Sequence, residues 1–185
     1  GSMSCQDDAE APWLAPTRQL ISRTVRAGTP FLGICLGHQL ATVALGGQVC
    51  TSDHFCLGAA EMHLTPEGKK DPLLSVYDGH RGIHFNNDVA VVLPEDAVLL
   101  ARDPTGQIEA VRFAERAWGV QFHPECTPEI FDAWTIGHGE KEWQQRLPWS
   151  EAVTVAETVR RDIDTVNAEE AFAARFQELI DPEKR

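Results

Sequence analysis

Cys35 lies in a segment whose residue types suit nucleophilic chemistry. It follows the apolar run Phe31–Ile34 and precedes a segment with helical spacing, in the local pattern Gly33-x-Cys35-x-Gly37. This is the cysteine version of a nucleophile elbow, a sharp strand-to-helix turn in which a Cβ on either side is expected to clash. The unpaired N–H groups and the dipole at a helix N-terminus favour a thiolate over a thiol. Cys35 is therefore a candidate nucleophile, with a buried structural cysteine as the alternative.

A second stretch, residues 117–125, supplies a candidate base. It is predicted to be a buried strand that ends in His123 and Glu125. Residues two apart in an extended segment face the same way, so His123 can take a proton from Cys35 while Glu125 orients the imidazole. By role this is a Cys-His-Glu triad, and the backbone N–H of Leu36 is the candidate donor to an oxyanion. A structural histidine and a plain surface carboxylate are the alternatives.

The two stretches together resemble the class I (triad-type) glutamine amidotransferases. The family's base motif, Phe-His-Pro-Glu, is matched by residues 122–125. Its nucleophile motif, Gly-x-Cys-x-Gly-x-Gln, is matched by Gly33, Cys35, Gly37 and Gln39. The order and separation of the two motifs also fit, and within the family the chain is most similar to stand-alone domains like the amidotransferase domain of GMP synthase.

This resemblance, which is good over residues 28–131 and poor in the C-terminal third, implies a reaction. Glutamine would be hydrolysed at its side-chain amide through a thioester on Cys35, and the ammonia would pass to a separate synthase protein. Gln39 would contact the bound glutamine or support the oxyanion loop, and Gly1 would belong to a loop that supplies a second oxyanion N–H. No cofactor is implied. The family's domain normally begins with a strand-helix-strand portion, which we expect this chain to lack.

Two other functions stay open on the sequence. The family segment that lines the glutamine pocket is matched only loosely by His84 and Asp88. Asn86 and Asn87 depart from it, and we expect them to form a turn, with a role in substrate specificity as the alternative. A γ-glutamyl hydrolase or peptidase with the same triad, acting on another γ-glutamyl compound, is therefore the first alternative. A non-catalytic regulatory or binding protein with the same fold is the second.

The composition indicates one acidic globular domain over residues 1–185. Hydrophobic residues make up 43% of the chain, and 28 acidic against 16 basic side chains give a net charge of −12. An acidic surface repels phosphate backbones, which argues against a nucleic-acid partner. No apolar run has the length of a membrane span, and no secretion signal is visible.

The cysteines favour a reducing compartment. There are five of them, an odd number with no framework spacing, which suits the cytoplasm better than a disulfide scaffold. Cys50, His54 and Cys56 are too few and wrongly spaced for a zinc site, so no metal is expected.

The elements that must position these residues alternate between strand and helix. This alternation predicts an α/β fold, with a central mostly parallel sheet covered by helices. The resemblance makes it a flavodoxin-like amidotransferase fold, with antiparallel strands added beside the parallel sheet. We expect helices over residues 16–27, 36–45 and from 128 to 134, a helical turn over 72–76, and strands over 31–34, 48–50, 57–64, 83–85, 90–93, 97–101, 108–113 and 118–122.

The C-terminal third is expected to form a helical extension over residues 150–185. Its first helix has a stripe of Val155, Val159, Ile163 and Val166 and can be capped by Ser150. Its second has a stripe of Phe172, Phe176, Leu179 and Ile180, with Asn167 and Glu170 as a capping box. We expect these stripes to pack in the core, with a partner-docking surface as the alternative.

Overall fold

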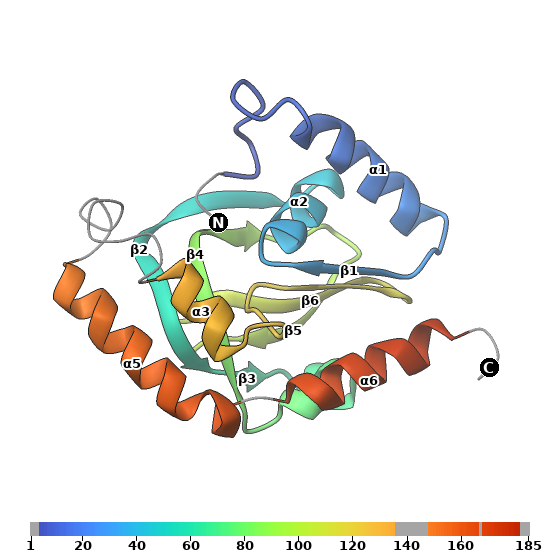
Figure 1. Ribbon diagram of the computed structural model, residues 1–185. Helices are drawn as coiled ribbons and strands as arrows, with labels where there is room; N and C mark the ends of the chain where they lie inside the picture. Colours follow the sequence, from blue (N-terminus) through green and yellow to red (C-terminus); the bar gives the residue numbers. More distant parts are fainter. Residues whose placement is uncertain (1–3, 136–147, 167, 182–185) are drawn as a thin grey trace.

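A computed structural model of the chain describes residues 4–135, 148–166 and 168–181. Helices and strands alternate in its first part, antiparallel strands follow, and helices close the chain (Figure 1). In order the elements are α1 (Leu14–Arg26), β1 (Phe31–Ile34), α2 (Leu36–Ala44), β2 (Gln48–Glu61), β3 (His63–Leu64), the 3-10 turns η1 (Gly68–Lys70) and η2 (Leu74–Tyr77), β4 (Arg81–Val92), β5 (Val98–Arg102), β6 (Ile108–Ala114), β7 (Ala117–Val120), α3 (Pro128–Trp134), α5 (Trp149–Val166) and α6 (Glu169–Ile180).

Two sheets organise the described strands. The larger has five strands in the order β1-β7-β6-β5-β3, in which β1 and β7 run parallel and every other neighbouring pair is antiparallel. The smaller is the antiparallel pair β2-β4. The expected α/β class, with antiparallel strands added beside a parallel part, is confirmed, and among the described strands the parallel part is the β1–β7 pair.

Helices cover both faces of the larger sheet. Val111 and Phe113 on β6 pack with α1 and α2, in a cluster that includes Ile21 and Leu40. Trp118 and its neighbours form the cluster on the other face, with η2 and α6. The side chains alternate between the two faces because the period of a strand is two residues. The sheet therefore lies between two apolar layers, and the end of β7 emerges between them.

A third apolar cluster joins the smaller sheet to the C-terminal helices. Ile83 on β4 packs with Phe131 of α3 and with Val159 and Ile163 of α5. These side chains are all at most 2% exposed, so the expected α5 stripe packs in the core at these positions. Phe172 of α6 is likewise buried, in the cluster with Trp118.

The expected turn at Asn86 and Asn87 is wrong. Both lie within β4, which runs unbroken from Arg81 to Val92, and Asn86 is opposite Cys56 on β2. The separate strands expected over residues 48–50 and 57–64 are likewise replaced by the continuous strand β2 and the short strand β3. The ladder between the two long strands satisfies their backbone groups, and this long-range pairing overrides the local preference of paired asparagines for turns.

Three expected details of the helices also change. Ser150 is the second residue of α5 rather than its cap. The N-cap of α6 is Ala168, without a side-chain hydrogen bond, and Asn167 lies outside the described residues. The helix expected over residues 16–27 runs from Leu14 to Arg26 as α1, with Ile21 and Val25 buried and Leu20 57% exposed.

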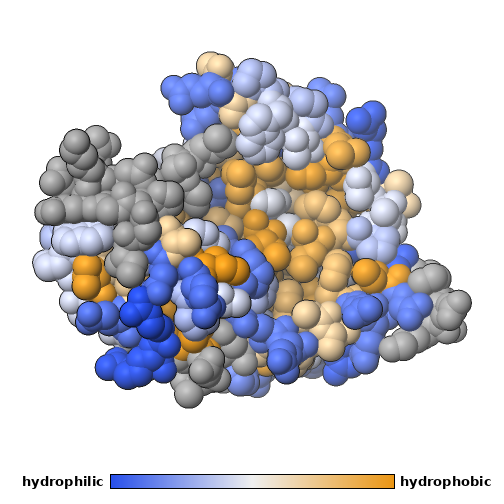
Figure 2. Space-filling model, viewed as in Figure 1, coloured by the Kyte–Doolittle hydropathy of each residue, from blue (hydrophilic) through white to orange (hydrophobic). Residues whose placement is uncertain are grey.

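Figure 2 shows a broad hydrophobic area on one face, between the part of the molecule that holds α1 and α2 and the part that holds α6. β1 is the end strand of the five-stranded sheet, and its Leu32 and Ile34 are half-buried. The described residues thus cover β1 only in part. Within the same described ranges, none of the helices combines the length and the apolar character that a bilayer crossing requires.

Candidate functional site

Cys35 occupies a sharp turn between β1 and α2. Its φ of 47° and ψ of −105° make it the one non-glycine residue with positive φ in the described part of the chain. Its N–H donates to the Val120 carbonyl at 2.8 Å, and its own carbonyl accepts the first helical hydrogen bond, from Gln39 N at 3.1 Å. Such strained residues persist where the surroundings over-determine them, and they cluster at functional sites. The turn thus sets Cys35 beside the end of β7.

The two glycines of the turn have different surroundings. A Cβ on Gly33 would lie 2.6 Å from the carbonyl carbon and oxygen of Gly37, because the incoming strand is pressed against the first turn of α2. A Cβ on Gly37 would meet nothing within 4 Å in the described residues. The expected need for a small residue is therefore confirmed before Cys35 and wrong after it.

His123 and Glu125 come together just beyond β7. His123 Nδ1 lies 2.6 Å from Glu125 Oε1, and the Glu125 side chain is 44% exposed while that of His123 is 11% exposed. Trp134 of α3 packs against the imidazole, with ring centroids 4.5 Å apart. His123 N also donates to the Ile83 carbonyl at 2.8 Å, which ties the end of β7 to β4. The imidazole is therefore held by Glu125 and Trp134, and the backbone of His123 is held by β4.

Cys35 and His123 are electrostatically coupled. Burial alone would raise the pKa of the Cys35 thiol, but the polar interaction with His123 and the charge of its ring outweigh burial, and the pKa falls. Burial alone would lower the pKa of His123, but Cys35 and Glu125 together raise it to about 9. His123 Nε2, the ring nitrogen that does not face Glu125, makes no hydrogen bond of ordinary geometry to any described residue. The pair favours a thiolate beside an imidazolium.

Backbone and amide groups complete the surroundings of the sulfur. The backbone N–H of Leu36 also lowers the pKa of Cys35. Gln39 is buried, and its Nε2 donates to the Asp88 carbonyl at 2.7 Å and to Gln121 Oε1 at 3.2 Å. Gln121 Nε2 in turn lies 3.6 Å from Cys35 Sγ. Gly1 lies outside the described residues.

His84, a residue expected to line a substrate pocket, is instead buried, and its ring is held by hydrogen bonds within the protein. Its Nε2 lies 2.6 Å from Glu109 Oε2 and its Nδ1 lies 3.0 Å from the Gly82 carbonyl, and His84 and Glu109 are almost fully buried. Both ring nitrogens face acceptors, so both donate and the ring carries a charge. In agreement, the pull of Glu109 outweighs burial and raises the pKa of His84.

Gln121, Glu109 and Trp134 were missed in the sequence. Gln121 is two residues before His123, so the alternation that placed His123 also places it on the same side of the extended chain. Glu109 interrupts the apolar segment Ile108–Ala114, and a charge at a buried strand position indicates a buried partner. No local pattern singles out Trp134.

Two other groups near the turn are structural. His38 is fully buried against Phe113, without a hydrogen-bond partner in the described ranges, and burial lowers its pKa to about 4. It is therefore neutral. Cys126 is buried in the cluster with Phe131, and burial with the nearby charge of Glu125 raises its pKa to about 12. Across the described residues, no three His, Cys, Asp or Glu side chains gather as a metal site would require.

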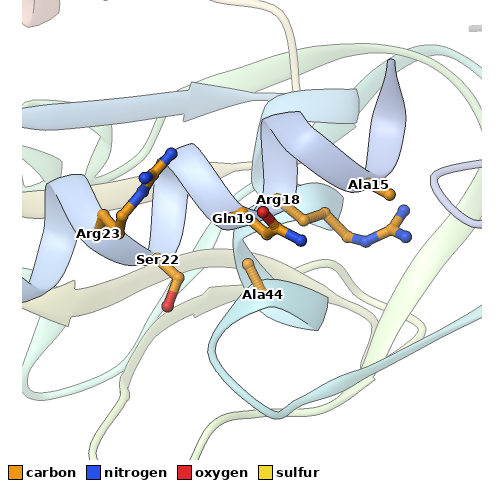
Figure 3. A pocket seen from close by; sticks show the side chains of 6 residues that line it. All are labelled: Ala15, Arg18, Gln19, Ser22, Arg23 and Ala44. Atoms are coloured by element: carbon orange, nitrogen blue, oxygen red, sulfur yellow. The ribbon is translucent and has the colours of Figure 1, made fainter. Parts of the chain in front are cut away.

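An open hollow between α1 and α2 lies at the other end of the elbow helix. Figure 3 shows its lining residues, which reach α2 only at its last residue, whereas Cys35 precedes its first. None of the candidate site residues contributes to it. Its lining consists of Ala15, Arg18, Gln19, Ser22, Arg23 and Ala44.

Several known proteins are similar in sequence. The chain is 37% identical over 115 residues to the glutamine-hydrolyzing GMP synthase of Marinobacter nauticus, covering 54% of this chain and 20% of that protein. It is 34% identical over 101 residues to one subunit of the glutamine-hydrolyzing GMP synthase of Methanothermobacter thermautotrophicus, covering 52% and 51%. It is 32% identical over 126 residues to the glutamine amidotransferase-like protein YfeJ of Salmonella typhimurium, covering 68% and 52%. The chain thus spans between a fifth and about half of the length of these relatives.

Solved structures share the fold. A glutamine amidotransferase from Thermotoga maritima superposes with a TM-score of 0.79 at 20% identity, covering 98% of this chain and 75% of the other. Another from Methylobacillus flagellatus gives a TM-score of 0.79 at 24% identity, covering 98% and 74%. The family model described as "Glutamine amidotransferase class-I" matches residues 8–137, which include both motifs and all five strands of the larger sheet. The chain belongs to the class-I glutamine amidotransferase family.

Proposed function

We propose that this chain is the glutaminase part of an amidotransferase, with Cys35 as nucleophile, His123 as general acid and base, and Glu125 as the residue that orients His123. The observation that carries the proposal is the pairing at the turn. A strained cysteine at a helix N-terminus has its thiol pKa lowered beside a histidine whose other ring nitrogen lies 2.6 Å from a carboxylate. This is the arrangement that an activated thiol nucleophile needs.

The proposed reaction runs in two steps through a thioester. The Cys35 thiolate attacks the side-chain amide carbon of glutamine, the oxyanion accepts from the Leu36 N–H, and ammonia leaves with a proton from His123. Water then attacks the γ-glutamyl thioester and gives its proton to His123, which releases glutamate and returns the electron pair to sulfur. Glu125 keeps the imidazole in the tautomer that presents Nε2 to the reacting atoms.

Of the two roles expected for Gln39, contact with glutamine and support of the site, the proposal keeps the second. Gln39 is buried and bonded to Asp88 and Gln121, so we assign it to the support of the site rather than to contact with glutamine. Gly1 keeps its proposed part in a second oxyanion donor.

We further propose that the ammonia serves a separate synthase protein. Two of the similar proteins are named as one subunit of a glutamine-hydrolyzing GMP synthase, which supports a partner that carries the acceptor chemistry. The acidic net charge of −12 favours a partner that offers a basic surface.

Comparison of substrates tests the proposal against its rival. Purified protein is assayed for hydrolysis of glutamine, of γ-glutamyl anilides and of γ-glutamyl peptides, beside Cys35→Ala as a blank. We expect glutamine to have the highest kcat/KM. Hydrolysis of the peptides in place of glutamine would instead establish a γ-glutamyl hydrolase, and equal rates for the protein and the Cys35→Ala variant would leave a non-catalytic binding protein.

A further inference from the structure

Gln121 is fully buried at the point where β7 ends, between the two elements that carry the site. Its backbone N–H donates to the Glu109 carbonyl at 2.8 Å, which keeps it in line with the neighbouring strand β6. The residue before it, Val120, accepts from Cys35 N at 2.8 Å. The Gln121 side chain, at 3.6 Å from Sγ, thus approaches the sulfur from a backbone that is itself bonded to Cys35.

The orientation of the Gln121 amide follows from its partners. Gln39 Nε2 donates at 2.7 Å to the backbone carbonyl of Asp88, a group that can only accept. This bond requires the nitrogen end of the Gln39 amide at that position, and its second N–H faces Gln121 Oε1 at 3.2 Å. Because Oε1 is taken up as an acceptor, the Nε2–H end of Gln121 is the end that faces Cys35.

We propose that Gln121 is a thiolate-binding residue of this site, which donates its Nε2–H to Cys35 Sγ, and that Gln39 is the positioning residue that holds it in this orientation. The inference rests on the proposed role of Cys35 as nucleophile. The chain from the Asp88 carbonyl through Gln39 and Gln121 to the sulfur joins β4, α2 and β7 in one network without a solvent-exposed member.

A donor at this position acts in both halves of the reaction. A thiolate accepts a hydrogen bond better than a thiol or a thioester sulfur does, because hydrogen bonds to charged groups are the stronger ones. Gln121 therefore favours the thiolate before the S–C bond forms. It also favours departure of the sulfur when that bond breaks and the electron pair returns to it. His123 remains free to give a proton to the leaving ammonia and, in the second step, to accept one from water.

The test measures how fast the Cys35 thiol is alkylated as pH is varied. Iodoacetamide is the probe, and the Cys35 peptide is quantified by mass spectrometry because the chain has five cysteines. Gln121→Met removes the donor at similar volume, and Gln39→Met removes only the anchor. Gln48→Met is the matched control, because Gln48 is exposed at the start of β2.

We expect the apparent pKa of Cys35 to rise by about one unit in Gln121→Met, which is about tenfold less thiolate at a given pH below it. A smaller rise is expected in Gln39→Met, and none in Gln48→Met. An unchanged pKa in a folded Gln121→Met protein would overturn the inference. If the wild-type thiol itself titrates at an ordinary value of about 8.5, the proposed function fails with it, so the two failures are distinguishable.

A measurement on the wild-type protein covers the case in which the variants do not fold. The side-chain ¹⁵N–¹H signals of Gln121 are followed by NMR as Cys35 is titrated. We expect them to move with the same midpoint as the alkylation rate, because the donor changes partner from thiol to thiolate. Signals that stay constant through that midpoint would contradict the inference.

Discussion

Cys35 and His123 shift each other's pKa in opposite directions, and this sets the expected response of the site to pH. The pKa of Cys35 is lowered and that of His123 is raised to about 9. Below the pKa of Cys35 the nucleophile is protonated, and above pH 9 the imidazolium that must protonate the leaving ammonia is lost. A plot of kcat/KM for glutamine against pH should therefore be bell-shaped, with its alkaline limb near pH 9. An alkaline limb at the ordinary histidine value of about 6.5 would contradict the coupling.

Replacement of Glu125 should move that alkaline limb. Glu125→Gln removes the negative charge that helps to raise the pKa of His123, so the limb should shift below pH 9. Because the Glu125 side chain is 44% exposed, solvent screening limits the expected shift to about half a unit to one unit. Glu129→Gln is the control, since Glu129 bonds to Thr127 instead of His123 and its loss should leave the limb in place.

At the scale of elements, the β1–α2 turn depends on its first glycine and not on its second. Gly33→Ala would place a Cβ 2.6 Å from the backbone of Gly37, and neither strand nor helix can move without losing the hydrogen bond between Cys35 and Val120. We expect a loss of about 1–3 kcal/mol in the free energy of unfolding, measured by urea denaturation. Gly37→Ala meets no described atom, so its stability should stay within about 0.5 kcal/mol of wild type. Equal losses of stability in the two variants would contradict the claim that the turn is crowded at Gly33 and open at Gly37.

At the scale of elements, the sequence could predict features that depend on neighbouring residues and could not predict those that depend on distant ones. Cys35, His123 and Glu125 could be predicted as site residues because their motifs are local, and the strand-helix alternation predicted the α/β class. Asn86 was misplaced because its conformation is decided by its partner on β2, Cys56, which lies thirty residues earlier in the chain. Long-range pairing of this kind leaves no local signal.

The supporting residues show a related limit. Gln121 was missed although it lies two residues before His123, because a neutral amide does not by itself indicate a catalytic role. Its role is visible only when Gln39 and Cys35 are brought beside it by the fold. Gln39 was predicted as a site residue from its motif, and in the structure its amide donates to Asp88 and Gln121.

At the scale of the whole molecule, α5 is part of the core rather than a free surface. Ile163 is 1% exposed and packs with Ile83 and Phe131, so it joins the C-terminal helix to β4 and α3. Ile163→Ala should lower the free energy of unfolding by about 2–5 kcal/mol through the cavity it leaves. Leu20→Ala, at a position that is 57% exposed, should change it by about 0.5 kcal/mol or less. If Ile163→Ala were as stable as the wild-type protein, the alternative that the α5 stripe is a partner-docking surface would be favoured.

Labelling with a glutamine-analogue electrophile tests the central claim most directly. Intact-mass spectrometry would follow the wild-type protein and its Cys35→Ala variant after exposure to the reagent at neutral pH. The account predicts a single adduct on the wild-type protein that the variant lacks, because Cys35 combines a lowered thiol pKa with a neighbouring histidine. An adduct of equal size on both proteins, or none on the folded wild-type protein, would contradict Cys35 as the activated nucleophile of a glutamine site.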